Sequence, residues 1–511
     1  MQNQLIIIGA GASGLAAAVA AARGGAQVLL IEQKNSIGKK ILATGNGRCN
    51  YTNLKMNTEY FRSTHGAALV GTLLKAYPAE KIIDFFKTLG VYPWVREGYV
   101  YPASMQALTM VHVFEQALEH LGVQIISDTK VTAIEKKNHS FYVQTTNGCY
   151  VAANIILATG GKASAALGSD GSGYPLAKTF GHHIVTPVPA LCGLKCQGRF
   201  FKAIAGVRTH GTVTLYVSAS DKTAEENGYS DTGELQMTTY GISGIPVFQV
   251  SRYAASALQQ GKIVTAEIDF MPEWAEDDLQ TFLRARQKAL FYKTSLQFLE
   301  GLLNEKLLPL ILKAAAIDEN LSVQQLGEAQ IDRLCERLKH FRMSVDAVND
   351  FDSAQVCAGG VDAGEVDIHT MMSNYCEGLY LTGELLDVDG MCGGYNLHFA
   401  WATGLMAGEA AAKAALKNRK LQNDNVEYKH SNKKSYKSEN NNLQNRNLKK
   451  TDNQNQGKTE KYNSGKKESL KAVQEVRQHV EKQKAKQKEK YRGKQSVSHQ
   501  LIRGENKGGR R

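Results

Sequence analysis

The chain has 511 residues, 43% of them hydrophobic, which is enough for two or three domains and at least one large core. Its net charge of +12 is unevenly distributed, because residues 417–511 hold 27 Lys and Arg against 10 Asp and Glu. The rest of the chain therefore lacks a basic excess that would by itself indicate nucleic-acid binding. Eight scattered cysteines without a CxxC pair are typical of free thiols in a reducing cytoplasm.

Residues 5–22 carry no charge, so a signal or membrane segment has to be weighed. Three glycines interrupt the run and no basic residue precedes it, which favours a strand, a turn and a helix of a cytoplasmic protein over a membrane span. A zinc site at His182, His183, Cys192 and Cys196 is disfavoured, since their spacing matches no common zinc motif. We expect no bound metal.

The first predicted elements form a dinucleotide-binding unit. A strand at residues 5–8 runs into Gly9-Ala10-Gly11-Ala12-Ser13-Gly14, and a helix and a second strand ending at Glu32-Gln33 follow. Gly9 allows a tight turn, Gly11 lets the backbone approach a pyrophosphate, and Gly14 lets helix and strand pack closely. The helix N-terminus offers amides to the phosphates, and Glu32 lies where a carboxylate accepts bonds from ribose hydroxyls. The pattern predicts dinucleotide binding without deciding between FAD and NAD.

Residues 34–53 are polar and rich in glycine, which predicts a loop over the bound nucleotide. This loop supplies candidate contacts to phosphates, to a substrate anion or to a flavin ring: Lys40, Gly47, Arg48, Cys49 and Asn50. Residues 104–121 show a helical apolar stripe. The stretch from 123 to 161 indicates strands of a β-meander that end in the turn Thr159-Gly160-Gly161.

The pattern changes near residue 191. Residues 211–219, 233–251 and 262–272 are strand-like, and residues 275–345 are mostly helical in pattern. A strand and glycine turn return near residue 355. We therefore predict a first domain part at 1–190, an inserted β and helical domain at 191–352, a second part of the first domain at 353–416, and a disordered basic tail at 417–511.

A second glycine segment, TGELLDVDGMCGGYNLHFAWATG, occupies residues 382–404 and indicates a strand end, a turn and a helix N-terminus. FAD is long, so it requires one site for its ADP half and another for its ring. The helix N-terminus would stabilise the negative charge of the reduced ring by about 0.3–1 kcal/mol. No second strand-GxGxxG-helix unit is evident, so NAD(P)H is expected to dock only transiently as a co-substrate.

Five motifs in order, GNGRCNYTN, EGYVYPAS, GELQMTTYGISGIPVFQVS, VCAGGV and the segment at 378–408, resemble the HI0933-like family of NAD(P)/FAD-dependent oxidoreductases, which includes BaiN and aminoacetone oxidase-like enzymes. The resemblance implies an α/β fold: a glutathione-reductase-like FAD-binding Rossmann domain with an inserted β-barrel-like and helical domain. It also implies cofactor contacts at Val131, Thr159, Gly160, Gly383, Glu384, Asp389, Gly394, Tyr395 and Asn396.

The leading interpretation is a FAD-dependent oxidoreductase that transfers hydride through flavin N5 between NAD(P)H or oxygen and a small organic substrate. Two alternatives stay open. The basic tail favours a flavoprotein that acts on RNA or is anchored to RNA or another acidic partner. The other alternative is a redox-sensing scaffold whose tail is the interaction module. No residue is assigned a catalytic role.

Overall fold

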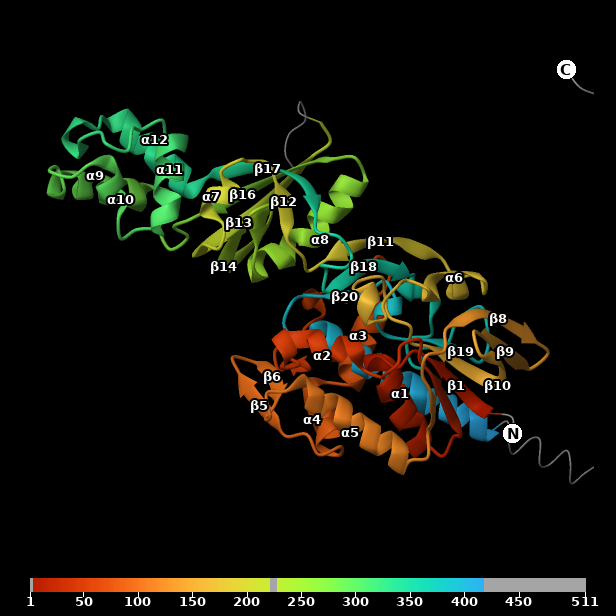
Figure 1. Ribbon diagram of the computed structural model, residues 1–511. Coiled ribbons are helices and arrows are strands. Elements are labelled where there is room, and N and C mark those ends of the chain that lie inside the picture. Colours follow the sequence, from red (N-terminus) through yellow and green to blue (C-terminus); the bar gives the residue numbers. More distant parts are fainter. Residues whose placement is uncertain (1–2, 221–227, 418–511) are drawn as a thin grey trace, which may run out of the picture. The chain divides into compact units, whose positions relative to one another are not determined.

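The computed structural model describes residues 3–220 and 228–417, and the first domain is built on a parallel sheet. Its strands run in the order β7 (Gln124–Ile126), β2 (Val28–Ile31), β1 (Asn3–Ile8) and β10 (Gly148–Leu157), with β19 (Leu379–Leu381) paired to β10. Figure 1 labels β1, β10 and β19 of this sheet. The apolar residues of β1 are buried, as expected for a parallel strand covered on both faces. The predicted α/β Rossmann class is confirmed.

Strand β10 has two different partners on one side. Its first half pairs with β9 (Ser140–Thr145), which continues the antiparallel meander to β8 (Val131–Lys137). Its second half, from Ile155 to Leu157, pairs in parallel with β19. Because β1, β10 and β19 are parallel, their carboxyl ends meet at one edge of the sheet, and ligands of such sheets bind at that edge. The two glycine segments are thereby brought together.

Two helices pack unusually closely behind this edge. They are α1 (Ala12–Arg23), which is rich in alanine, and the helix at residues 395–417. A Cβ on Gly404 would lie 2.2 Å from the Ser13 carbonyl oxygen, and one on Gly408 would lie 2.4 Å from the Ala17 oxygen. Only glycine permits this approach. Trp401 anchors the second helix, because its Nε1 donates to the backbone oxygen of Tyr51 at 3.1 Å.

Further elements complete the first domain: α2 (Lys39–Ala43), β3 (Thr52–Asn53), β4 (Phe61–Arg62), α3 (Ala67–Ala76), α4 (Ala79–Lys87), β5 (Pro93–Arg96), β6 (Tyr99–Pro102), α5 (Ala107–His120), α6 (Gly173–Lys178) and β20 (Asp389–Gly390). Helix α5 is the helix expected over residues 104–121. Its buried Phe114 stacks on Trp401 with ring centroids 5.7 Å apart, and Phe86 of α4 meets the same ring edge-on. These rings form part of one continuous core.

The inserted domain begins and ends at a two-stranded sheet formed by β11 (Ile184–Ala190) and β18 (Val356–Val361). Beyond this sheet lies a closed barrel, in the order β12 (Leu194–Cys196), β15 (Gly241–Ser243), β14 (Tyr229–Thr238), β13 (Arg208–Ser218), β16 (Ile263–Asp269) and β17 (Phe341–Val348). The barrel and its helices enclose a separate hydrophobic core. The predicted β-barrel-like and helical insertion is therefore confirmed.

The helices of the insertion are α7 (Phe201–Ile204), α8 (Ile245–Gln259), α9 (Glu276–Ala289), α10 (Ser295–Leu299), α11 (Leu308–Ala314) and α12 (Glu328–Lys339). Helices α9 to α12 gather beside the barrel in Figure 1, and α12 contacts β16 and β17. Helix α8 instead packs on β13 and β14 and also contacts β11. Helix α8 thus borders the first domain.

Several local expectations were wrong. Residues 245–251, read as a strand, begin α8, because Gly244 turns the chain at φ 107° and Pro246 occupies the first turn of a helix. The loop expected at 34–53 contains the short helix α2, whose Ile41 is buried. The helical region expected to reach residue 345 ends at Lys339, where β17 begins two residues later and completes the barrel.

Among residues 3–220 and 228–417, none of the helices combines the length and the apolar character that crossing a membrane requires. The predicted disordered tail lies, apart from Lys417, outside the described residues.

Candidate active site

A cavity of about 870 Å3 runs along the carboxyl edge of the parallel sheet, from the end of β2 to the start of the helix at 395–417. Most residues predicted to hold a dinucleotide line it: Gly9, Ala10, Gly11, Ala12, Ser13, Glu32, Gln33, Lys40, Arg48, Asn50, Val131, Thr159, Gly160, Glu384, Gly394 and Asn396. They come from the turns after β1, β2 and β10, from α2 and the loop that follows it, from the start of β8 and from residues 382–396, here called the ring segment. One continuous space therefore connects both glycine segments.

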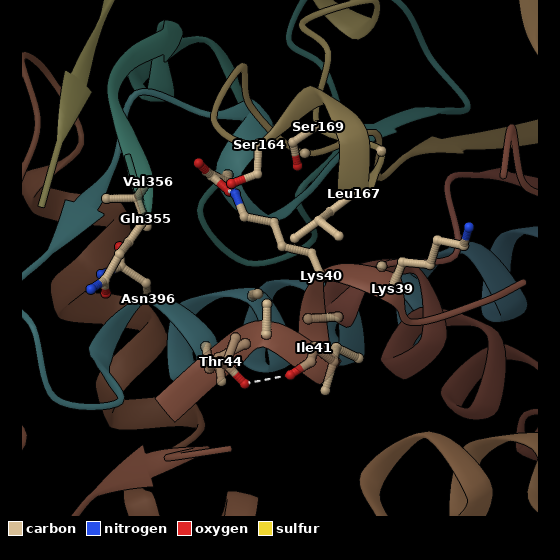
Figure 2. A pocket seen from close by; sticks show the side chains of 18 of the residues that line it. Lys39, Lys40, Ile41, Thr44, Ser164, Leu167, Ser169, Gln355, Val356 and Asn396 are labelled. Carbon is tan, nitrogen blue, oxygen red and sulfur yellow. Dashed lines mark hydrogen bonds and ion pairs between the residues drawn. The ribbon is translucent and has the colours of Figure 1, made fainter. Parts of the chain in front are cut away.

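Figure 2 shows part of this cavity from close by. Lys40 extends from α2 toward Ser164, which lies with Leu167 and Ser169 on the loop after β10. Gln355 and Asn396 lie at the other end of the view. The last turn of α2 is closed by the Thr44 hydroxyl, which donates to the Ile41 oxygen at 2.6 Å. A short helix and a loop therefore face each other across the space.

The first glycine turn has the geometry of a phosphate cradle. A Cβ on Gly14 would lie 1.9 Å from the Gly9 oxygen, and one on Gly9 would lie 2.5 Å from the Ala158 oxygen. A Cβ on Gly11 would meet nothing within 4 Å. Among the described residues, no side chain caps the α1 N-terminus, so its amides remain available to an anion. Gly9 and Gly14 are needed for packing, whereas Gly11 borders open space.

Glu32 is 8% exposed at the end of β2 and closes the far side of this turn. Its Oε2 accepts from the Ala10 N–H at 2.7 Å and its Oε1 from the Lys34 N–H at 2.8 Å. Burial raises the pKa of Glu32, and these backbone bonds oppose that rise. Each oxygen retains a second lone pair, so the carboxylate is held in place and can still accept from a ligand hydroxyl.

Lys40 and Glu384 connect α2 to the ring segment. Their side chains form an ion pair at 2.7 Å, and Glu384 Oε1 also accepts from the Cys357 N–H at 3.0 Å. Each side chain is about one-fifth exposed, because both line the cavity. A lysine that was predicted to serve phosphates is therefore already engaged by a carboxylate, and it holds two walls of the cavity together.

The start of the helix at 395–417 is fixed by its own turn. Asn396 accepts from the Gly390 N–H and donates to the Gly390 oxygen, both at 2.8 Å. Gly394 lies so close to β3 that a Cβ would be 2.7 Å from the Thr52 oxygen. The neighbouring Asn50 has a buried Oδ1 with no hydrogen-bond partner among the described residues. The same holds for Thr159 Oγ1. Both residues line the cavity.

Six predicted cofactor residues do not line the cavity: Gly14, Gly47, Cys49, Gly383, Asp389 and Tyr395. Gly383 packs behind the edge, where its N–H donates to the Thr403 hydroxyl at 3.0 Å. The Tyr395 ring lies between Tyr60 and Phe61, and its hydroxyl donates to the Lys55 oxygen. Gly383 and Tyr395 therefore lie behind the walls of the site rather than in the cavity.

Cys49 and Asp389 are buried titratable groups next to the site. Burial raises the pKa of the fully buried Cys49 thiol to about 12, so it stays protonated at neutral pH. Burial also raises the pKa of Asp389 to about 7, against the opposing effect of Arg252 and Arg62. Asp389 Oδ1 lies 3.3 Å from Arg252 Nη2 without hydrogen-bond geometry. Neither group faces the cavity.

His398, on the helix at 395–417, is fully buried. Its Nδ1 bonds with the Thr52 hydroxyl at 2.8 Å and its Nε2 with the Tyr77 oxygen at 3.0 Å. Since a carbonyl can only accept, Nε2 carries the proton and Nδ1 accepts from Thr52. Burial lowers the pKa of His398 to about 4, so the ring is neutral and packed.

The four residues weighed as a zinc site have other partners. His182 and His183 both contact Glu365, at 3.1 and 3.2 Å, and His182 also bonds Ser373. Cys192 Sγ donates to the Asn349 oxygen at 3.8 Å. In the part of the chain that the structure describes, no group of three or more His, Cys, Asp and Glu is placed to hold a metal ion.

Several cavity residues were missed from the sequence. The loop after β10 contributes Gly168, Ser169 and Ser172. The glycine-rich sequence GSDGSG at 168–173 was the local pattern that could have indicated them. Aromatic and apolar residues at the ring-segment end come from β6 and α8: Tyr99, Tyr101, Ile245 and Phe248. These residues lie within the motifs EGYVYPAS and GELQMTTYGISGIPVFQVS, but neither motif was assigned a place in the site from the sequence. The positions of Ile245 and Phe248 at the cavity depend on how the insertion docks.

A Rossmann sheet, a glycine cradle with an acid at the next strand end, and a second glycine segment on the same cavity define the class as FAD-type oxidoreductase flavoproteins. The HI0933-like protein Rossmann domain matches residues 3–410. The chain belongs to this family, as its motifs indicated.

Two kinds of relative are similar over nearly their whole length. The 3-dehydro-bile acid delta(4,6)-reductase of Clostridium scindens is 44% identical over 415 residues, covering 80% of this chain and 99% of the relative. The ribosomal RNA dihydrouridine synthase of Haemophilus influenzae is 28% identical and covers 78% of this chain and 96% of its own. Among solved structures, an open flavocytochrome c3 fumarate reductase has a TM-score of 0.43 at 16% identity, covering 81% of this chain and 79% of that chain.

Proposed function

We propose that this protein is a FAD-dependent reductase that uses NAD(P)H to saturate a C=C bond conjugated to a carbonyl group in a small organic substrate. The observation that carries the proposal is the 44% identity to a delta(4,6)-reductase over 99% of that relative. A 3-dehydro bile acid with delta(4,6) bonds is a conjugated ketone, and uridine likewise has a C=C bond next to a carbonyl. The relatives therefore share one type of reduction, in which a hydride and a proton add across the double bond.

The residues of the cavity fit a flavin nucleotide. Gly11 borders open space at an uncapped helix N-terminus, and Glu32 is oriented by two backbone N–H groups. Further along the cavity, the buried oxygens of Asn50 and Thr159 have no partner among the described residues, as expected of groups that bond a ligand. A bound flavin would supply hydride transfer at its N5 atom.

The chain's own residues have distinct roles in this proposal. The first amides of α1 bind the pyrophosphate, and Glu32 accepts from the ribose. The Lys40–Glu384 pair holds α2 against the ring segment, and the N-terminus of the helix at 395–417 stabilises negative charge on the reduced ring. The substrate enters at the ring-segment end, between the aromatic residues of β6 and the first turn of α8.

A second candidate is the same reduction performed on uridine in ribosomal RNA. It is favoured by the two ribosomal RNA dihydrouridine synthases, each 28% identical to this chain over 78% of its length. The 27 basic residues of 417–511 would bind phosphate groups with strong salt dependence. This candidate shares the cavity and differs in the size of the substrate.

The test begins with the purified full-length chain. We expect a yellow protein whose flavin absorbance is bleached anaerobically by NADH or NADPH and restored by a 3-dehydro bile acid with delta(4,6) bonds, which gains two hydrogens by mass. Restoration only by ribosomal RNA, with formation of dihydrouridine, would favour the second candidate. A colourless chain that does not take up FAD would refute both, and bleaching only by an amine or acid substrate would indicate an oxidase.

A further inference from the structure

One face of α8 links the insertion to the cavity. Residues 245, 248, 249, 252 and 253 follow helical spacing and lie on the same side of the helix. Ile245 and Phe248, at the N-terminal end of this face, line the cavity. The next turns of the same face contact the first domain. The wall of the cavity and the docking contacts of the insertion are therefore parts of one rigid element.

Three polar contacts fasten this face to the first domain. The Gln249 side-chain oxygen accepts from the Cys392 N–H of the ring segment at 3.0 Å. Arg252 Nη2 lies 3.3 Å from Asp389 Oδ1, also in the ring segment. The Tyr253 hydroxyl accepts from Arg62 Nε of β4 at 3.2 Å, and β4 pairs with β20, the strand that contains Asp389. The contacts thus converge on the segment that would hold the flavin ring.

The Arg252–Asp389 pair is the most buried of these contacts. The Asp389 side chain is 3% exposed and that of Arg252 is 20% exposed. Arg62 also faces Asp389, but its Nη1 and Nε groups donate to the Tyr60 oxygen and the Tyr253 hydroxyl. The nearby carboxylates Asp387 and Glu384 repel the charge of Asp389. Removing Arg252 would leave the buried Asp389 carboxylate without its ion-pair partner. We therefore expect the attachment of α8 to the ring segment to depend strongly on Arg252.

Two stretches of chain join the insertion covalently to the first domain. The chain enters it between β11 and β12 and leaves it between β17 and β18. In β18, Gly359 and Gly360 have positive φ, and β11 shifts register opposite them. An irregular two-stranded connection of this kind can bend more readily than a continuous sheet.

We propose that Arg252 is a positioning residue that fastens α8 to the ring segment, so that the docked insertion forms the outer wall of the substrate end of the cavity. The inference rests on the proposed function, since the wall keeps water and oxygen from the reduced cofactor. Loss of Arg252 releases α8 and exposes the cavity, whereas the nucleotide cradle at Gly9 to Gly14 stays intact.

The test compares Arg252→Met with Arg252→Lys, which retains the positive charge. The matched control is Arg208→Met, which breaks an exposed pair with Glu234 on the barrel. All proteins are studied at pH 8, above the pKa of about 7 of Asp389. Hydrogen exchange is measured for residues 245–259 and 386–396, together with iodide quenching of the bound flavin's fluorescence.

We expect Arg252→Met to speed exchange in both segments by at least about threefold and to raise the iodide quenching constant by a similar factor. Arg252→Lys should lie close to the wild type, and Arg208→Met should match it. If Arg252→Met does not fold, Gln249→Ala tests the same face and should loosen the same two segments. Exchange in both segments that equals that of the Arg208→Met control would overturn the proposal. Hydrogen exchange does not require bound flavin. A chain that binds no flavin would refute the proposed function, and hydrogen exchange would still test the role of Arg252.

Discussion

Gly14 and Gly11 belong to one glycine motif but meet different requirements. Gly14 permits close packing of the backbone, whereas Gly11 borders open space. A Cβ on Gly14 would lie 1.9 Å from a backbone oxygen, which cannot move away as a flexible side chain can. At Gly11, φ is −81° and the position borders open space, so alanine fits the folded chain. The motif was predicted from spacing because its turn lies within one strand-turn-helix unit, although the oxygen that a Cβ on Gly9 would meet belongs to Ala158, after β10. The structure adds that Gly14 is required by packing, whereas Gly11 lines the cavity.

Gly14→Ala should destabilise the first domain by about 3 kcal/mol, because the backbone of the turn must shift. Gly11→Ala should change the free energy of unfolding by less than about 0.5 kcal/mol and weaken flavin binding by about tenfold or more. Urea unfolding and flavin titration measure the two effects. Wild-type flavin affinity in Gly11→Ala would contradict the placement of the pyrophosphate at this residue.

His398 should make the folded chain sensitive to acid. Its pKa of about 4 lies below the ordinary value of 6.5, so the unfolded chain binds a proton more readily than the folded chain. Its contribution to stability is complete above pH 6.5 and is lost as pH falls toward 4, by a total on the order of 3 kcal/mol. Urea unfolding of His398→Gln at pH 7.5, 6 and 5 should show a shallower loss than the wild type. The exposed His112, changed to Gln, controls for removal of a histidine.

At the scale of elements, sequence reasoning succeeded where a segment carries its own pattern. The strands around the first glycine motif are short apolar runs next to turn residues, and helix α5 carries a helical apolar stripe, so these elements were predicted. Helix α8 was misread because Ile245, Val247 and Phe248 favour strands locally, whereas packing on the barrel decides the outcome. Helix α2 was missed because five residues are too few to show a helical stripe.

The Lys40–Glu384 pair joins elements that are 344 residues apart in the chain. Lys40→Met and Glu384→Gln should each weaken flavin binding, and the double variant should show a coupling of about 1 kcal/mol, since both side chains are partly exposed. Flavin titration of the four proteins gives this coupling directly. Additive effects would show that the pair does not hold the two walls together. The exposed pair Lys87–Asp84 serves as a control without effect on flavin binding.

At the scale of the whole molecule, the basic excess and the cavity of the candidate site belong to different parts of the sequence. The cavity lies in residues 3–417, whereas the basic excess lies in residues 417–511. A chain ending at residue 417 should therefore retain its visible spectrum and its turnover of a small substrate. It should also lose any salt-dependent binding to RNA. Turnover assays and filter binding at 50 and 200 mM salt measure these properties. Loss of small-substrate turnover would show that the tail contributes to the site.

Strand β10 pairs with β9 along its first half and with β19 along its second half, and this affects when the sheet can be completed during synthesis. On its side away from β1, the part of β10 at residues 155–157 pairs with β19, at residues 379–381, so about 220 residues emerge between these two strands. At 5–20 residues per second, this edge stays open for roughly 10–45 s of synthesis. The cofactor site is completed only after that interval, because the ring segment follows β19 directly. Flavin that binds the completed site therefore cannot protect the first half of a nascent chain, and the insertion emerges while that half is still an open sheet.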